Sequence, residues 1–374
     1  MNRNAQEQER YAPQMLLQEI GSEGQEKLKA AKVLVVGAGG LGCPALLYLA
    51  GSGVGTLGVM DFDVVAVSNL HRQILFNESD TGRNKAQCAA DKLKIINPFV
   101  VVNAIAERLT VKNIRNIITG YDVIIDATDN FSTRYLISDG CVLAEKPCVF
   151  GSLHKFSGQV AVFNQLLDDG KRSPVYRDVF PSPPSLGSVT DCAEAGIIGP
   201  VAGIIGAIQA TETIKLITGA GITLAGKLLV IDVLNQTYNR MEVFGNKSIS
   251  QGSPKTWIEL EEFDYEEFST KIPVSGKIDS YHLDEILSKE TKVQVIDVRE
   301  EWEVTGLPGL EAIPIPLYEL PNRIEELDKS IFTVVICAGG KRSELAVKVL
   351  QKAGFHKVRS LEGGINAWLD REKV

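Results

Sequence analysis

A glycine-rich turn, an acid and several cations are spaced so that they could bind a nucleotide. Residues 33–42 read VLVVGAGGLG, an apolar run that enters the glycines, and Asp61 ends the next apolar run, TLGVMD. Glycines allow a phosphate to approach backbone N–H groups at a helix N-terminus, where the helix dipole favours anions. Asp61 can accept a hydrogen bond from a ribose hydroxyl, which completes a dinucleotide-binding fingerprint. This pattern alone does not separate NAD from another nucleotide, and a tight turn without any ligand is the alternative.

The residues after Asp61 favour a nucleotide with several phosphates. The stretches SNLHRQ and TGRNKAQ contribute Asn69, Arg72, Gln73 and Lys85. An Arg and a Lys that converge on one strand edge suit a triphosphate and a departing pyrophosphate. A dehydrogenase needs no such cluster, and the sequence has no obvious His/Asp arrangement for hydride transfer. Taken in isolation, the two cations would be interpreted as solvated surface charge.

A second candidate for chemistry is Cys337, which ends the apolar strand TVVI and begins the loop CAGGKRS. The N–H groups of residues 338–343 can surround the sulfur as an anion-binding nest before a helix, and Arg342 adds positive charge. Such a site stabilises a thiolate or a persulfide anion. The alternative is a glycine turn with an incidental thiol.

The first set of motifs, in combination, resembles the MoeB/ThiF/HesA family, which are prokaryotic relatives of the ubiquitin-activating enzymes. The resemblance covers roughly residues 10–245 and rests on GAGGLG, DFDVVAVSNLHRQ, GRNKA and DATDNFSTR. It implies ATP-dependent adenylation of a ubiquitin-like sulfur-carrier protein at its C-terminal Gly-Gly, carried out by a homodimer. By position it implies Gly40 and Gly42 against the phosphates, Asp61 on the ribose, Asn69, Arg72, Gln73 and Lys85 on the phosphates, and Asp129 at Mg²⁺ and the α-phosphate, with Asn130 and Arg134 following in the same motif.

The C-terminal part of the chain, roughly residues 275–374, resembles a single-domain rhodanese. DVREEWE, IPIPLYEL, the Cys337 loop and LEGGINAW carry this resemblance. It implies that Cys337 accepts sulfane sulfur as a persulfide, from a cysteine desulfurase or thiosulfate, with Asp297 and Arg299 as supports. The persulfide would then attack the acyl-adenylate, and the carrier would leave as a thiocarboxylate. Cys192, in SVTDCAEAGIIGP, is either a small buried residue or, as the first family implies, a loop thiol that forms an acyl-disulfide with the carrier.

The sequence departs from both family patterns. RYAPQ replaces the usual RYxRQ, so Pro13 stands where the family has an Arg that reaches the partner subunit's ATP, and Arg10 is a possible substitute. Val175 and Asp178 stand at the positions of a zinc-binding CxxC pair, so we predict no structural zinc. In the rhodanese-like part, TGLPGLEA lacks the usual His, and Gly339 replaces a Ser or Thr. A non-catalytic carrier-binding scaffold, which Pro13 favours, and an NAD-dependent oxidoreductase are the alternative functions.

Composition limits the other possibilities. The net charge of −8 over 374 residues argues against bulk binding to nucleic acid or to an anionic membrane. Six cysteines without a CxxC pair are typical of cytosolic thiols. The polar N-terminus lacks a signal peptide, and the apolar stretch 197–208 is too short to span a bilayer. We therefore expect a cytoplasmic protein, although the sequence does not choose among the molybdopterin, thiamin, cysteine and tRNA-thiolation pathways.

These residues need an α/β fold to bring them together. We predict a doubly wound, Rossmann-like, mostly parallel sheet in a domain over 1–245, a linker over 246–274 and a small α/β rhodanese domain over 275–374. Acids at the carboxyl end of a parallel strand, such as those of 121–130, would lie at the edge where ligands bind. The predicted strands are 33–37, 56–61, 100–107, 121–130 and 293–300, with further strands in 140–170; the predicted helices include 41–52, 83–98, 113–120 and 193–218, and 173–191 is expected to be a loop.

Overall fold

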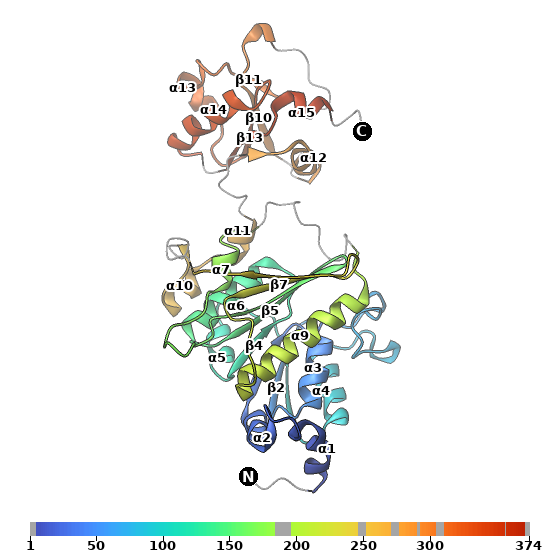
Figure 1. Cartoon of the computed structure of the whole chain (residues 1–374). Coiled ribbons are helices and arrows are strands. Elements are labelled where there is room, and N and C mark those ends of the chain that lie inside the picture. The colour runs from blue at the N-terminus through green and yellow to red at the C-terminus, as the bar shows by residue number, and fades with distance from the viewer. Residues whose placement is uncertain are drawn as a thin grey trace. The chain divides into compact units, whose positions relative to one another are not determined.

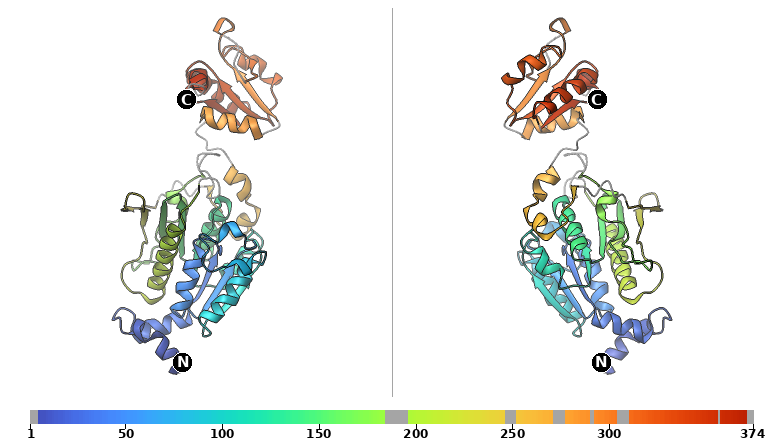
Figure 2. Two further views of the ribbon diagram at one scale, coloured as in Figure 1. Left: turned by 90° about the vertical axis from the view of Figure 1, so that its right-hand side faces the viewer. Right: turned by 90° about the vertical axis from the view of Figure 1, so that its left-hand side faces the viewer.

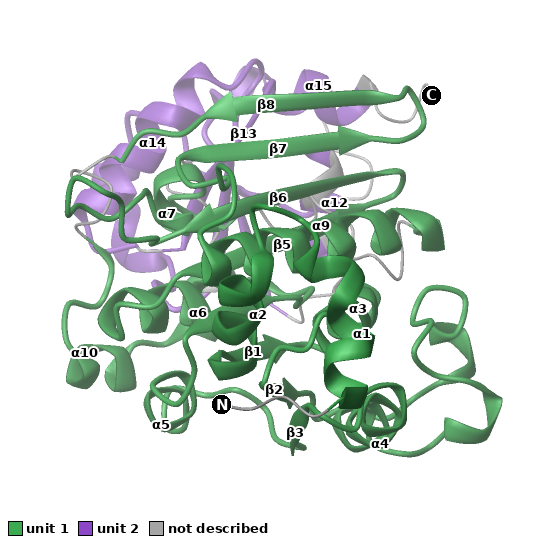
Figure 3. Cartoon of the chain, turned by 60° about the horizontal axis from the view of Figure 1, so that its bottom comes forward, with its two compact units in different colours: residues 1–183, 190–269 green, residues 184–189, 270–374 purple. Residues whose placement is uncertain are grey.

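The chain folds into two compact units, which are described separately (Figure 3). The computed structural model describes residues 5–183, 196–245, 252–270, 277–289, 292–303, 310–355 and 357–370. Unit 1 holds the described residues up to Ser269, and unit 2 holds those that follow.

Unit 1 is built on an eight-stranded sheet in the order β3-β2-β1-β4-β5-β6-β7-β8 (Figure 1). Pairing is parallel from β3 through β5 and antiparallel from β5 onward. The first five strands have the 3-2-1-4-5 order of a doubly wound fold, which confirms the predicted Rossmann-like sheet. The strands are β1 (Lys32–Val36), β2 (Thr56–Met60), β3 (Val101–Ile105), β4 (Val123–Asp126), β5 (Cys148–His154), β6 (Ser157–Phe163), β7 (Lys227–Asp232) and β8 (Thr237–Glu242).

Helices cover both faces of this sheet (Figures 1 and 2). Helices α3, α4 and α9 pack on one face, and α5, α6, α7 and α10 contribute to the core on the other. The helices of unit 1 are α1 (Ala5–Met15), α2 (Gly21–Ala30), α3 (Gly42–Gly51), α4 (Lys85–Ile96), α5 (Ile114–Ile118), α6 (Phe131–Leu143), α7 (Tyr176–Val179), α9 (Gly199–Thr218), α10 (Trp257–Glu262) and α11 (Tyr265–Thr270).

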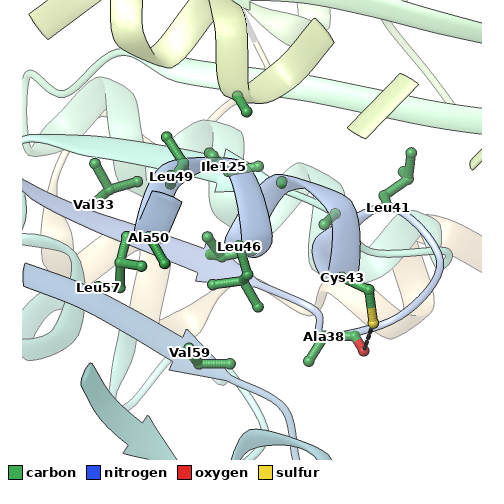
Figure 4. Close-up of a cluster of buried hydrophobic side chains, with 14 of the residues drawn as sticks. Val33, Ala38, Leu41, Cys43, Leu46, Leu49, Ala50, Leu57, Val59 and Ile125 are labelled. Carbon is green, nitrogen blue, oxygen red and sulfur yellow. Dashed lines mark hydrogen bonds between the residues drawn. The ribbon is translucent and has the colours of Figure 1, made fainter. Parts of the chain in front are cut away.

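The continuous apolar run of β1 follows from burial on both faces. Val33 and Val35 belong to the core cluster under α3, α4 and α9, whereas Leu34 and Val36 belong to the cluster under α5 and α6. Successive side chains of a strand point to opposite faces, so a strand covered on both sides has no polar alternation. Figure 4 shows the first cluster, with side chains of β1, β2 and β4 packed around α3.

The structure differs from the sequence prediction after β4. The predicted strand 121–130 ends at Asp126, and α6, which the sequence did not predict, begins at Phe131. The Asn130 side chain caps this helix by accepting a hydrogen bond from the Thr133 N–H at 2.9 Å. A helix N-cap of this kind ends the preceding extended segment. Only β5 and β6 fall within the region 140–170 where strands were expected.

Helix α9 is a core helix of unit 1. It is the one described helix that is long and apolar enough to cross a membrane, and half of its apolar window is buried in the protein. It packs against α3, β5 and β6. Burial inside the sheet–helix core therefore accounts for its composition.

Part of the predicted linker 246–274 is packed into unit 1, which corrects that boundary. Leu260 of α10 and Tyr265 of α11 are buried in the second core cluster. The Tyr265 hydroxyl donates to Asp139 Oδ2 at 2.8 Å, and Arg177 donates to both oxygens of Asp139 at 2.8 and 2.7 Å. The Arg177 guanidinium also lies over the Phe268 ring, 4.7 Å from its centroid. Contacts so distant in sequence could not be anticipated from composition.

Unit 2 is a smaller α/β unit with a five-stranded parallel sheet in the order β11-β10-β12-β13-β9. Its strand β12 leads into the Cys337 loop, and α14 follows, as the sequence predicted. The strands are β9 (Lys277–Ile278), β10 (Val293–Asp297), β11 (Ile313–Pro314), β12 (Phe332–Ile336) and β13 (Val358–Leu361); the helices are α12 (Ser280–Lys289), α13 (Leu320–Arg323), α14 (Lys341–Lys352) and α15 (Gly364–Asp370).

The buried ion pair should be a large contributor to the stability of unit 1. Asp139 and Arg177 are 3% and 4% exposed, so Asp139→Ala leaves a buried guanidinium without its partner. We expect a loss of about 3–5 kcal/mol in the free energy of unfolding. Tyr265→Phe should cost about 1 kcal/mol, because it removes one hydrogen bond.

Urea unfolding of the full chain measures both losses. Asp169→Ala is the control, because the Lys171–Asp169 pair is exposed and should not shift the midpoint. Equal unfolding midpoints for Asp139→Ala and Asp169→Ala would contradict the contribution of the buried Asp139–Arg177 pair to the stability of unit 1.

Candidate functional site

A pocket lies at the carboxyl edge of the parallel strands of unit 1. It is lined by the glycine turn after β1, the acids after β2, the crossover that leads to α4 and the loop after β4. Parallel strands place these distant segments at one edge, as expected for a doubly wound fold. Of the predicted nucleotide-binding residues, all except Gly42 and Asn69 line this pocket: Gly40, Asp61, Arg72, Gln73, Lys85, Asp129 and Asn130.

The glycines of the turn have different tasks. Gly37 has a φ of +96°, and a Cβ there would lie 2.6 Å from the Ala127 carbonyl oxygen. A Cβ on Gly42 would lie 1.9 Å from the Gly37 carbonyl oxygen, so Gly42 lets α3 begin tightly against the turn. Gly40 lines the pocket. Gly40 thus leaves the backbone open to a ligand. Gly42 does not line the pocket, and its contact with a phosphate stays a prediction.

Asp61 is held by backbone donors on both oxygens. It accepts hydrogen bonds from the Ala38 N–H at 2.8 Å and from the Asp63 N–H at 2.9 Å. Burial raises the pKa of the Asp61 carboxyl, and the charge of Lys85 acts in the opposite direction. The Lys85 ammonium lies 3.2 Å from Asp63 Oδ2. The acid is therefore fixed in place, with a buried cation beside it.

The crossover segment presents a cation and an amide to the pocket. Arg72 donates to the Ser68 carbonyl at 3.0 Å. Gln73 is only 3% exposed, and its Oε1 has no hydrogen-bond partner among the described residues. An unpaired buried acceptor is costly, so a donor from a ligand would suit this position. Asn69 lies outside the lining, but its carbonyl accepts the N–H groups of Arg72 and Gln73 at 3.1 and 3.0 Å and so shapes the turn that carries them.

The loop after β4 is fixed from beneath by Arg134, which the sequence analysis named, and by three residues that it did not select. The buried Asp126 accepts hydrogen bonds from Thr128 N–H and Oγ1 at 3.0 and 2.6 Å. Arg134 donates to the Thr128 carbonyl at 2.8 Å, and Gln209 of α9 donates to the Asp126 carbonyl at 2.8 Å. Burial raises the pKa of the Asp126 carboxyl, which Arg134 opposes. The signal in the sequence for Asp126 was an acid that ends an apolar strand.

These supports leave Asp129 facing the pocket. Its carboxylate is exposed and forms no hydrogen bond or ion pair within the described ranges. Asn130, which also lines the pocket, uses its side-chain carbonyl to cap α6. A carboxylate held on a rigid loop without a protein partner is suited to a cation or to a reacting group.

Phe62 and Arg108 also line the pocket, although the sequence analysis did not select them. The Arg108 guanidinium lies 4.4 Å from the centroid of the Phe62 ring, a cation–π contact that forms part of the wall beside Asp61. The sequence signal for these two residues was their position at the ligand-binding edge: Phe62 comes directly after β2, and Arg108 comes shortly after β3.

Two departures from the family pattern can be located in the structure. Arg10 donates to the Ile96 carbonyl at 3.0 Å and does not line the pocket of its own chain. Asp178 accepts a hydrogen bond from the Val175 N–H at 2.8 Å. Among the described residues there is no group of three or more His, Cys, Asp or Glu that could hold a metal ion. That no structural zinc is bound remains a prediction.

In unit 2, Cys337 lies in a nest of donors. Its sulfur accepts hydrogen bonds from the N–H groups of Gly340 at 3.1 Å and Ser343 at 3.4 Å, and the Ser343 hydroxyl lies 3.4 Å away. Burial raises the pKa of the thiol, but the hydrogen bonds from Ser343 and from the loop N–H groups outweigh it. The net pKa of Cys337 is therefore below its ordinary value, which favours the thiolate.

The charges around this loop are arranged in pairs. Arg342, expected to add positive charge, forms two hydrogen bonds with Glu303 and shares its charge with that carboxylate. The pair lowers the pKa of Glu303 to about 2. Arg299 Nε donates to both oxygens of Asp297, at 3.1 and 3.0 Å, beside the same loop. The sulfur is thus stabilised mainly by N–H groups, while Cys192 lies outside the described residues.

Family models match both parts of the chain. The ThiF family model matches residues 11–251, and the rhodanese-like domain model matches residues 282–371. These matches agree with the two motif sets identified in the sequence.

Curated relatives with both parts are similar over nearly the whole chain. The probable adenylyltransferase/sulfurtransferase MoeZ of Mycobacterium tuberculosis is 41% identical, over 96% of this chain and 92% of its own length. The adenylyltransferase and sulfurtransferase MOCS3 of Culex quinquefasciatus is 39% identical, over 98% and 88%. The sulfur carrier protein adenylyltransferase of Thermus thermophilus is 47% identical, over 70% of this chain and 97% of its own length.

Solved structures show the same fold at lower identity. PaaA superposes with a TM-score of 0.56 at 24% identity, over 65% of this chain and 76% of that chain. E. coli MccB superposes with a TM-score of 0.56 at 21% identity, over 68% and 74%. The chain therefore belongs to the ThiF family and, with its rhodanese-like domain, is an adenylyltransferase/sulfurtransferase similar to MoeZ and MOCS3.

Proposed function

We propose that unit 1 uses ATP to adenylate the C-terminal glycine of a ubiquitin-like sulfur carrier, and that a Cys337 persulfide then supplies sulfur for a thiocarboxylate. The observation that carries the proposal is the pocket that gathers Arg72, Lys85 and Asp129 around the glycine turn. Asp129 has no hydrogen-bond or ion-pair partner among the described residues. The N–H donors around Cys337 would stabilise the sulfur nucleophile that reacts with the activated carboxylate.

The pocket residues fit ATP. Backbone N–H groups near Gly40 would meet phosphate oxygens, and Asp61 would accept from a ribose hydroxyl. Among the described residues no donor reaches the buried Oε1 of Gln73, and a nucleotide hydroxyl would supply one. Asp129 would hold Mg²⁺, because exposed carboxylates without protein partners are ligands that this ion prefers. Bound there, Mg²⁺ would neutralise phosphate charge.

Adenylation requires alignment and charge neutralisation rather than a general base. The carrier carboxylate is already ionised, and its oxygen attacks the α-phosphorus while the bond to the β-phosphate oxygen breaks. Arg72 and Lys85 offset the repulsion between the two anions and stabilise the departing pyrophosphate. The Asp126, Arg134 and Gln209 contacts keep the Asp129 loop in place during this step.

Sulfur transfer would begin at the Cys337 thiolate. The thiolate attacks the sulfane sulfur of a donor, either a cysteine desulfurase persulfide or thiosulfate, and the donor leaves as a thiolate or as sulfite. The terminal sulfur of the persulfide then attacks the acyl carbon, and AMP leaves. We propose that Cys192 then attacks the acyl-bearing sulfur, so that the bond from that sulfur to Cys337 breaks and the carrier is held as an acyl-disulfide with Cys192. An external thiol attacks the Cys192 sulfur, forms a disulfide with it and releases the thiocarboxylate, and a second thiol restores Cys192. Fusion of both activities in one chain raises the effective concentration of the sulfur donor.

The proposal includes a homodimer and a carrier that ends in Gly-Gly. A non-catalytic scaffold would bind the same carrier without forming an adenylate, and an NAD-dependent oxidoreductase would have no use for the cations. The experiments below separate these functions.

Arg72→Ala and Asp129→Asn should each lower carrier-dependent ATP–pyrophosphate exchange by about 100-fold or more, because each removes a charge at the reacting phosphates. The exchange is measured on the full chain with a panel of ubiquitin-like carriers. The exposed Asp169→Asn serves as the charge-matched control. Silence of every carrier with the unaltered protein, while ATP still binds, would favour the scaffold.

Cys337→Ala should abolish thiosulfate:cyanide sulfur transfer and leave ATP–pyrophosphate exchange unchanged, because the nucleophile lies in the other unit. The control is Cys88→Ala, which removes a thiol from α4. Turnover that persists in Cys337→Ala would remove this thiol from the mechanism.

A further inference from the structure

Two buried serines form a chain of hydroxyl groups behind the Cys337 loop. Ser343, in the first turn of α14, and Ser360, on β13, are 0% and 1% exposed. Their hydroxyl oxygens lie 2.7 Å apart, and the Ser343 hydroxyl lies 3.4 Å from the Cys337 sulfur. The chain therefore runs from β13 through α14 to the proposed nucleophile.

The Ser343 hydroxyl has one proton and three neighbours that could receive it. These are the Cys337 sulfur, the Gly340 carbonyl oxygen at 2.9 Å and the Ser360 hydroxyl. When Cys337 is a thiol, its S–H can donate to Ser343, which in turn donates to the Gly340 carbonyl. When Cys337 is a thiolate, the Ser343 proton is best placed on the sulfur, because hydrogen bonds to ionised acceptors are stronger. Ser343 must therefore rotate its proton as the charge on the sulfur changes.

Ser360 can support that rotation in two ways. If it donates to Ser343, it polarises the Ser343 hydroxyl and strengthens the bond to the sulfur. If it donates to the Gly340 carbonyl, 3.4 Å away, it satisfies the acceptor that Ser343 leaves. In either arrangement the second serine lowers the cost of moving the Ser343 proton onto the sulfur.

We propose that Ser360 is a positioning residue for sulfur transfer, because its hydroxyl holds that of Ser343 in the orientation that donates to the Cys337 sulfur. This inference rests on the proposed function, in which Cys337 is the nucleophile. No proton leaves either serine during the step. The thiolate attacks the sulfane sulfur, the sulfur–sulfur bond of the donor breaks, and the charge passes to the terminal sulfur of the persulfide. The Ser343 hydroxyl can then turn back and donate its hydrogen bond to the Gly340 carbonyl oxygen.

The test is the pH dependence of Cys337 alkylation by iodoacetamide in the full chain, followed by mass spectrometry of the Cys337 peptide. Ser360→Ala should raise the pKa of Cys337 by about half a unit to one unit, and slow alkylation about three- to tenfold at pH values below that pKa. Thr333→Val is the matched control, because it removes a buried hydroxyl from the neighbouring strand β12 that does not contact the sulfur. Its profile should match that of the unaltered protein.

A second variant separates the loss of the hydroxyl from a general loss of stability. Ser360→Thr keeps the hydroxyl and should keep the pH profile, even if its added methyl lowers the melting temperature. A profile for Ser360→Ala that coincides with that of Thr333→Val would overturn the proposal, as would an equal shift in Ser360→Thr and Ser360→Ala. Alkylation does not require sulfur transfer, so this result is independent of whether Cys337→Ala loses the proposed activity.

Discussion

The account depends on the close approach of two turns at the carboxyl edge of the parallel sheet. The turn after β1 and the loop after β4 lie so near each other that a Cβ on Gly37 would sit 2.6 Å from the Ala127 carbonyl oxygen. Strands β1 and β4 are direct neighbours, and both end at this point. Parallel strands share one carboxyl edge. The glycine turn, Asp61 and Asp129 therefore lie at that edge together, although they are far apart in the sequence.

The two candidate sites stabilise negative charge by different means. In unit 1, Lys85 and Arg72 provide cationic side chains, and Asp129 has no hydrogen-bond or ion-pair partner among the described residues. In unit 2, N–H groups of the loop after β12 surround the Cys337 sulfur, and Arg342 shares its charge with Glu303. The first arrangement suits the several charges of a triphosphate. The second suits a single anionic sulfur, whose charge moves by one bond during transfer.

The sequence was sufficient where local pattern decides structure. The apolar run of β1 and the glycine turn predicted both the parallel sheet and its ligand-binding edge, and the Cys337 loop was predicted from its glycines. The rest depended on contacts between residues far apart in the chain. The bond from Tyr265 to Asp139 spans 126 residues, so the packing of α11 into unit 1 could not be anticipated. Gly40 and Gly42 are likewise equivalent in the motif, and only the position of α3 assigns one to the pocket and the other to packing.

The most direct test of the whole account is the mass of the carrier after incubation with the full chain, ATP, thiosulfate and a thiol reductant. We predict that at least one ubiquitin-like carrier ending in Gly-Gly exchanges one C-terminal oxygen for sulfur, and that the exchange requires both ATP and Cys337. A panel in which every carrier keeps its original mass, although the protein binds ATP and forms the Cys337 persulfide, would contradict the account.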